Sequence, residues 1–268
     1  MPPKPRVPFE LHPAARLLSN TEIPHAVDVA LLPDDALGVL RGDWSSRQIE
    51  LHPAGGGAVE TLLAPDPSRP VAHVAWSDDG RRWAAVAGRF AGDARPGEVY
   101  VGERGREELL CVATLEEYGS VTRNSLPRAA STLAFSPDGA SVVARVSPCD
   151  GGDHLVEVET SSGEAKRLPV PGLKTYLYAH AFDRDGTLFA VAADPGLSGG
   201  LWWFPPGVRD RAGQSPSPIG FALLPAPRGL WVVGAPTRAF RLGKGVPARA
   251  TTDPRRASSA RSSRVARR

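Results

Sequence analysis

Leu133-Ala134-Phe135-Ser136-Pro137-Asp138-Gly139 is the segment that indicates the architecture of this chain most clearly. It is a short apolar strand that runs into a Ser-Pro-Asp-Gly turn, and the chain continues through the β-branched stretch Val142-Val143-Ala144. Aspartate followed by glycine suits a tight hairpin, because the carboxylate bonds nearby backbone N–H groups and glycine accepts a positive φ. The stretch therefore predicts a β-hairpin.

Similar segments recur along the chain, which makes the hairpin part of a repeat. Five copies can be laid over one another, at residues 26–35, 71–80, 133–139, 178–186 and 219–229. The glycines that close the last four copies are 59, 47 and 43 residues apart, which brackets the roughly 40–50 residues of one four-stranded blade. A large apolar residue precedes each turn and is expected to fill the space between neighbouring sheets. These residues are Leu32, Trp76, Phe135, Phe182 and Leu224.

A second recurring element follows each copy and consists of a short strand and a turn that contains glycine. Its copies lie at residues 48–55, 98–105, 155–163, 200–207 and 239–243. Two hairpins in each repeat predict about four strands per repeat. The 28 glycines and 27 prolines among 268 residues agree with many short strands separated by turns.

The order of these elements resembles that of a known repeat family. Phe135–Gly139, followed one hairpin later by Val156–Glu164, is similar to the repeat of WD40-like and TolB-like β-propellers, although no copy carries a Trp-Asp dipeptide. The resemblance covers residues 25–243 and implies an all-β fold, a β-propeller of about five recognisable four-stranded blades. A ring of six blades completed by terminal strands, and an incomplete ring, are the alternatives.

Composition changes at both ends divide the chain into three parts. Residues 1–24 are rich in proline and predict an irregular arm, with a strand added to the last blade as the alternative. Residues 25–246 form the predicted propeller domain. Residues 247–268 contain seven arginines and one aspartate and few apolar residues, which predicts a disordered tail. The tail accounts for the net charge of +3, because residues 1–246 carry −3.

Three features of the sequence bear on the compartment in which the protein is found. No apolar run reaches the roughly 18 residues of a membrane span, and the start of the chain has no apolar signal-peptide core. Cys111 and Cys149 lie in different repeats without a metal or redox spacing, so reduced thiols are predicted in preference to a disulfide. We expect a soluble, cytoplasmic monomer.

Three motifs could carry chemistry, and each has a structural explanation. Gly196-Leu197-Ser198-Gly199-Gly200 matches a hydrolase nucleophile elbow, but no helix pattern follows it and no histidine occurs after His180. The acids of 183–187 and 150–154 fit turns better than a calcium or zinc site. His73 and His180 are interpreted as hydrogen-bonded structural histidines. The sequence thus predicts no catalytic, cofactor-binding or metal-binding residue.

The repeat array favours a non-catalytic scaffold that binds a protein partner on one face of the ring. The residues expected to contact that partner are Trp44, Arg89, Phe90, Tyr118, Arg123 and Trp202. One alternative is a metal-dependent, lactonase-like hydrolase, because sugar lactonases have an architecture that resembles this one. The acids that could hold its divalent ion are Asp78, Asp138, Asp153 and Asp185. Another is an accessory protein that binds nucleic acid through the arginines of residues 247–268.

Overall fold

The computed structural model of the 268-residue chain describes most of residues 23–241. The described ranges are 23–87, 97–115, 133–146, 153–168, 176–193, 199–208, 210, 212–216, 220–226, 229–234 and 238–241. Their regular structure is β-strand apart from one 3-10 turn, η1 (Trp44–Ser46). Within these ranges no helix is long and apolar enough to cross a bilayer. The all-β prediction is therefore confirmed.

The strands form five antiparallel sheets, each built from consecutive strands in chain order. The first sheet contains β1 (Ala26–Leu31), β2 (Leu37–Arg41), β3 (Gln48–His52) and β4 (Glu60–Leu63). The second contains β5 (Val71–Trp76), β6 (Arg82–Ala87), β7 (Glu98–Glu103) and β8 (Cys111–Thr114). The third contains β9 (Leu133–Phe135), β10 (Ser141–Val146), β11 (His154–Glu159) and β12 (Ala165–Leu168).

The last two sheets continue the pattern. The fourth contains β13 (Tyr176–Phe182), β14 (Leu188–Ala193), β15 (Gly199–Phe204) and β16 (Gly213–Pro216). The fifth has three described strands, β17 (Gly220–Ala226), β18 (Gly229–Gly234) and β19 (Arg238–Arg241). The five sequence repeats thus correspond to five sheets.

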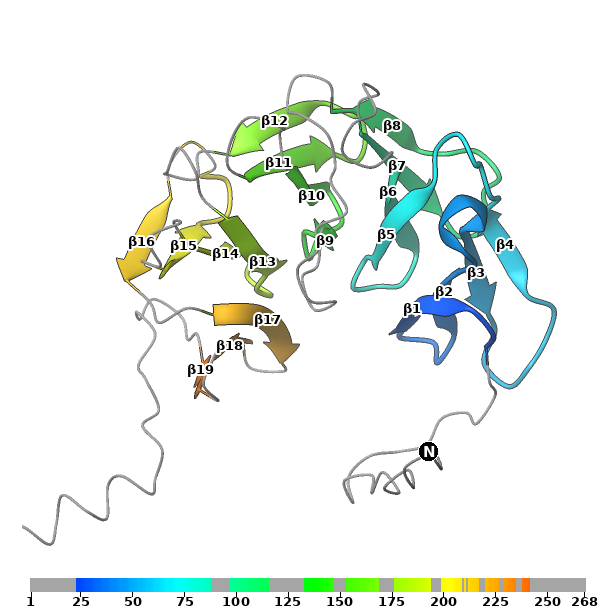
Figure 1. Ribbon diagram of the computed structural model, residues 1–268, viewed down its shortest axis with the longest axis horizontal. Helices are drawn as coiled ribbons and strands as arrows, with labels where there is room; N and C mark the ends of the chain where they lie inside the picture. Colours follow the sequence, from blue (N-terminus) through cyan, green and yellow to red (C-terminus); the bar gives the residue numbers. More distant parts are fainter. Residues whose placement is uncertain are drawn as a thin grey trace, which may run out of the picture.

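The sheets are arranged radially around a common centre (Figure 1). The first strand of each sheet lies nearest the centre, and the fourth strand of the first four sheets lies farthest from it (Figure 1). The inner strands contact one another in sequence, β1 with β5, β5 with β9, β9 with β13 and β13 with β17. In Figure 1 the sheets follow an arc from the first sheet, in blue, to the fifth, in orange.

The turn between β9 and β10 is closed by its own side chains. Ser136 Oγ donates to Asp138 Oδ1 at 2.6 Å and accepts the N–H of Ser141 at 2.9 Å, while Ala140 N–H donates to Asp138 Oδ1 at 3.0 Å. Gly139 has φ of 68°, a conformation that glycine adopts without steric cost. The predicted hairpin chemistry is therefore present.

The turn between β5 and β6 has the same geometry. Ser77 Oγ donates to Asp79 Oδ1 at 2.6 Å, and Gly80 has φ of 67°. We name the end of the sheets that carries these turns the turn end, and the opposite end, where η1 lies, the loop end. The turn ends of adjacent sheets are neighbours, since Arg82 Nη1 of the second sheet donates to Gly139 O of the third at 2.9 Å.

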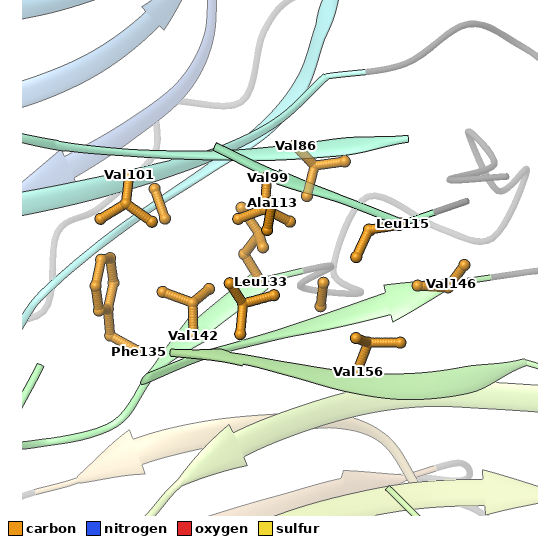
Figure 2. Close-up of a cluster of buried hydrophobic side chains, with 13 residues drawn as sticks. Val86, Val99, Val101, Ala113, Leu115, Leu133, Phe135, Val142, Val146 and Val156 are labelled. Atoms are coloured by element: carbon orange, nitrogen blue, oxygen red, sulfur yellow. The ribbon is translucent and has the colours of Figure 1, made fainter. Parts of the chain in front are cut away.

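The core lies between the sheets. Figure 2 shows the cluster between the second and third sheets, in which Val86 and Val101 face Phe135 and Val142. Phe182 packs in the same way with Val143, between the third and fourth sheets. The expectation that the large residue before each turn fills an inter-sheet space is confirmed for Phe135 and Phe182.

The first sheet differs because no described sheet precedes it. Its inner strand exposes three apolar side chains, Val27 at 47%, Val29 at 48% and Leu31 at 54%. Leu31 occupies the position that Trp76 has in the second sheet, directly before the turn. Trp76 packs toward the first sheet, whereas no described sheet lies in front of Leu31.

Hydrogen bonds in the turns establish this equivalence. Asp35 N–H donates to Leu32 O as Gly80 N–H donates to Ser77 O, so Leu32 corresponds to Ser77. Leu32 is buried and does fill an inter-sheet space, but it packs beside Trp76 of the following sheet. The alignment of residues 26–35 with 71–80 therefore holds, but Leu31 is the counterpart of Trp76, and Leu32, which was expected to be that counterpart, lies one residue later because two adjacent leucines precede this turn.

Two tryptophans pack directly on glycine backbone. A Cβ added to Gly38 of β2 would lie 2.2 Å from the indole of Trp76, and one added to Gly102 of β7 would lie 2.3 Å from the indole of Trp83. Such contacts cannot be accommodated without moving the half-buried indole of Trp76 or the buried indole of Trp83. These glycines are therefore required for the close approach of the large side chains.

Replacing Gly102 by alanine should lower the free energy of unfolding by about 1–3 kcal/mol, because the new methyl group displaces the buried Trp83 indole. Urea denaturation followed by tryptophan fluorescence measures this change. Gly57→Ala is the control, since the nearest side-chain atom to its added Cβ is the exposed Pro53 ring at 3.3 Å. Equal stability of Gly102→Ala and the wild type would contradict the packing.

Candidate functional site

The loop end carries the longest connections between described strands. Residues 88–97 link β6 to β7, and residues 115–132 link β8 to β9. The strand register places the end of β6, the start of β7 and the end of β8 at the loop end, because Ala87 pairs with Glu98 and Glu98 pairs with Thr114. The start of β9 lies at the same end, because the hairpin turn 136–140 follows that strand at the turn end. At the turn end, by contrast, the hairpins 77–81 and 136–140 are short and internally bonded.

The sequence-predicted partner residues fall into two groups. The backbone of Trp44 forms part of η1 at the loop end, and its side chain is outside the described part. Arg89, Phe90, Tyr118 and Arg123 also lie outside the described residues, within the two long connections. Five of the six residues therefore belong to segments that join strands at the loop end.

Trp202 is the exception among the predicted partner residues. It lies on β15, is only 4% exposed and packs with Phe182 and Leu188 in the core between the third and fourth sheets. Its indole stabilises the core, so we leave Trp202 out of any proposed contact surface. Alternating large residues on a strand do not reveal from sequence which face is covered by the next sheet.

A buried polar cluster joins the third and fourth sheets near the loop end. Arg145 Nη1 donates to Leu177 O at 2.6 Å, and Leu177 N–H donates to Asp153 Oδ2 at 2.8 Å. Arg145 and Asp153 are 3% and 7% exposed. Burial lowers the pKa of Arg145, and the negative charge of Asp153 opposes that effect. The two side chains thus satisfy both backbone groups of Leu177, where the β13–β14 pairing is irregular.

His180 lies in the same inter-sheet space. It is 2% exposed, and its Nε2 donates to Val143 O of the third sheet at 3.0 Å. Burial lowers the pKa of His180 to about 4, although the hydrogen bond to Val143 opposes the shift. The interpretation of His180 as a structural histidine is confirmed. Its Nδ1 has no hydrogen-bond partner in the described structure.

The outward face of the first sheet carries a charged cluster on its second and third strands. Arg41 Nη1 lies 3.1 Å from Glu50 Oε1, His52 Nε2 lies 2.8 Å from Glu50 Oε2, and Gln48 also donates to this carboxylate. Burial raises the pKa of Glu50, but these hydrogen bonds and the Arg41 charge outweigh it and hold the pKa below its usual value. This face is therefore polar on β2 and β3 and apolar on the inner strand β1, where Val29 and Leu31 are exposed.

A cavity of about 400 Å³ opens at the turn end between the third and fourth sheets. Its polar lining residues are Ser136, Asp138, Ser141, Glu157, Arg184 and Asp185. Ser141 Oγ donates to Glu157 Oε1 at 3.0 Å, and Asp185 Oδ1 accepts the N–H of Thr187 at 2.9 Å. Three carboxylates and one guanidinium make the lining acidic. Sequence reasoning missed this cavity because its walls come from two different repeats.

The acids considered for a metal site lie in different places. Asp138 and Asp185 line the cavity, whereas Asp153 contacts Leu177 near the loop end and Asp78 belongs to the turn of the second sheet. Across the described ranges, no group of three or more histidine, cysteine or acidic side chains is arranged to hold a metal ion. Asp138 also accepts two hydrogen bonds that close its own turn.

The other chemical motifs add little to this site. Cys111 is a free, half-buried thiol, and burial raises its pKa, which lowers its reactivity. Cys149 lies outside the described residues. Gly199 and Gly200 begin β15, so the predicted strand after the Gly-x-Ser-x-Gly motif is confirmed, while Ser198 lies outside the described part.

Comparison with solved structures identifies the class of fold. The chain is similar to the β-propeller domain of Cps50 (Swd1) from Myceliophthora thermophila, with a TM-score of 0.61 and 14% identity over 87% of this chain and 73% of that one. It is similar to a chain of a nidogen–laminin complex, with a TM-score of 0.54 and 13% identity over 83% and 78% of the two chains. The fold is therefore that of a β-propeller.

Prolyl oligopeptidase B from Galerina marginata also matches, with a TM-score of 0.58 and 12% identity over 84% of this chain. This chain covers only 37% of that protein, and it covers 35% of a prolyl endopeptidase that it matches at 17% identity. These likenesses concern the fold alone. Comparisons with protein-family models and with curated proteins give no match.

His180 should make the stability of the protein depend on pH. Its pKa is about 4 in the folded chain and about 6.5 when unfolded, so below pH 6.5 the unfolded state binds the proton first. Stability should therefore fall by about 3 kcal/mol between pH 6.5 and pH 4, with no further loss from this group below pH 4. In His180→Gln this part of the pH dependence should disappear, while His25→Asn, at an exposed position, should retain it. Denaturation at a series of pH values measures both, and identical profiles for wild type and His180→Gln would refute the assignment.

Removing Asp153 should be costly because it leaves the Arg145 guanidinium buried without its counter-charge. We expect Asp153→Ala to lower the free energy of unfolding by about 3–5 kcal/mol. The double variant Arg145→Met, Asp153→Ala should lose less than the single variant, because the buried charge is removed as well. Chemical denaturation of Asp153→Ala, Arg145→Met and the double variant tests the coupling, and a double variant that loses the sum of the two single changes would show that the residues act independently.

Proposed function

We propose that this chain is a non-catalytic β-propeller scaffold that binds a protein partner at its loop end. The observation that carries the proposal is the difference between the two ends of the sheets. The turns 77–81 and 136–140 are short and closed by their own hydrogen bonds, whereas the longest connections, 88–97 and 115–132, join strands at the loop end. Binding residues are commonly placed on such connections by a rigid scaffold.

The composition of the loop-end connections supports a protein partner. Trp44, Phe90 and Tyr118 provide aromatic side chains, and Arg89 and Arg123 provide guanidinium groups. Aromatic residues and arginine are the types most enriched at the energetic centres of protein interfaces. The sheets whose strands these connections join are held together by buried apolar clusters, which supports a rigid scaffold.

The turn carboxylates support a structural role in preference to metal-dependent hydrolysis. Asp79 and Asp138 each accept a serine hydroxyl and a backbone N–H within their own turn. The pKa of Asp79 lies below its usual value, mainly because of the hydrogen bond from Ser77. Similarity to a chain from a nidogen–laminin complex adds a fold-level analogy with a propeller found in a protein complex.

The proposal includes the organisation of the whole chain. Residues 1–24 and 247–268 are assigned as an arm and an arginine-rich tail that flank the propeller domain at 25–246. The scaffold is proposed to act as a cytoplasmic monomer. Binding is assigned to the domain, so the tail is not needed for it.

Affinity capture of the tagged chain, with quantitative mass spectrometry, tests the proposed surface. Trp44→Ala, Phe90→Ala, Tyr118→Ala and Arg123→Ala should each reduce capture of the same partner, and the strongest should reduce it by about tenfold or more. Arg106→Ala is the matched arginine control, since Arg106 is exposed, follows β7 at the turn end and should leave capture unchanged. Unchanged thermal midpoints exclude unfolding as the cause. Capture that is equal for all loop-end variants and the wild type would reject the surface.

A further inference from the structure

The cavity between the third and fourth sheets has a counterpart between the second and third sheets, where an arginine fills the space. In the second sheet Arg82 is the first residue of β6, and in the third sheet Ser141 is the first residue of β10. The hydrogen bond from Ser77 N–H to Arg82 O matches the one from Ser136 N–H to Ser141 O, so Arg82 and Ser141 occupy equivalent positions. Ser141 lines the cavity.

The guanidinium of Arg82 crosses to the next sheet. Its Nη1 donates to Gly139 O at 2.9 Å and lies 3.5 Å from Thr160 Oγ1. Strand register relates these acceptors to the fourth sheet, because Val142 pairs with Val158 as Leu188 pairs with Phe204. Thr160 lies two residues after Val158, and Pro206 lies two residues after Phe204, so Thr160 corresponds to Pro206.

The same comparison relates the turn glycines. Gly139 N–H donates to Ser136 O and Gly186 N–H donates to Asp183 O, so Gly186 is the counterpart of Gly139. Gly186 and Pro206 both line the cavity. The cavity thus occupies the space that a guanidinium fills one interface earlier, and it is present because the short Ser141 replaces a long side chain.

We infer that this cavity is a receptor for the guanidinium group of an arginine side chain supplied from outside the folded sheets. The inference goes beyond the loop-end surface, because the cavity lies at the opposite end. Asp138, Glu157 and Asp185 line the space together with Arg184, so the lining contains more carboxylates than guanidinium groups. Carboxylates and backbone carbonyls are the groups that a planar guanidinium recognises through several N–H donors at once.

The chemistry selects arginine over lysine. A guanidinium presents donors in a fixed plane and can reach both a carbonyl and a carboxylate, as Arg104 does with Gly80 O at 3.4 Å and Asp34 at 2.8 Å. Lysine presents a compact, strongly hydrated ammonium that is costlier to desolvate. Arginine plays this part elsewhere in the same chain, since Arg47 and Arg145 also reach from one sheet to the next and donate to backbone carbonyls.

Two sources can supply the arginine. One is a partner protein that presents an arginine-containing segment. The other is the chain's own residues 247–268, whose seven arginines oppose the net charge of −3 on residues 1–246. Both offer the same guanidinium, so the test separates them with a variant of the tail.

Calorimetric titration of the full chain with the capped peptide acetyl-Ala-Arg-Ala-amide tests the receptor, with acetyl-Ala-Lys-Ala-amide as the matched probe. We expect the lysine peptide to bind about tenfold more weakly. Glu157→Gln should weaken the arginine peptide by about tenfold, because it removes one carboxylate from the lining. Glu60→Gln, an exposed acid on β4, should leave binding unchanged.

Ser141→Arg should restore the side chain found one interface earlier. We expect it to fill the cavity, abolish binding of the arginine peptide and raise the thermal midpoint by about 2–4 °C. Changing all seven tail arginines to lysine in the full chain separates the sources: tighter peptide binding assigns the site to the tail, and unchanged binding assigns it to a partner. Equal affinity for the two peptides overturns the inference. So does binding that survives both Glu157→Gln and Ser141→Arg, or the absence of binding in both the wild type and the tail variant.

Discussion

The structure depends on the contact between the inner strand of one sheet and the backbone of the sheet before it. Trp76 lies directly on Gly38, and Phe135 packs against the small and β-branched residues of β6. Large side chains can enter the narrow space between sheets only where the opposite strand carries small residues. The alternation of large and small residues along the chain therefore sets the separation of successive sheets.

Arginines complete these interfaces where apolar packing ends. Arg47, Arg82 and Arg145 each leave one sheet and donate to a backbone carbonyl of the next. Buried carbonyls at strand ends need such partners, because an unpaired polar group away from water costs free energy. At the turn end between the third and fourth sheets the equivalent residue is Ser141, and a cavity with an acidic lining remains there. The same interface is thus filled by an arginine between the second and third sheets and open between the third and fourth.

The hairpin turns were predictable because their chemistry is local. Ser136 and Asp138 form hydrogen bonds within residues 136–140, and Gly139 supplies the positive φ of the turn. All the residues that make these interactions are therefore adjacent in the sequence. Trp202 shows the limit of the same reasoning. Its aromatic character is visible in the sequence, but its burial depends on the residues of the third sheet that cover it. The partner contact expected of it was therefore misplaced.

The all-β class, the repeat of five hairpin units and the chemistry of their turns follow from the amino-acid sequence, because strand periodicity and turn hydrogen bonds depend on neighbouring residues. Which face of each sheet is covered depends on how the sheets pack against one another. Leu31 and Trp76 occupy the same place in the repeat, yet Leu31 is 54% exposed because no described sheet precedes it. Likewise, Arg145, Asp153 and Leu177 meet, and the cavity beside Ser141 forms, only when sheets from separate repeats are brought side by side. Burial and cavities arise from these long-range contacts, which no single repeat contains.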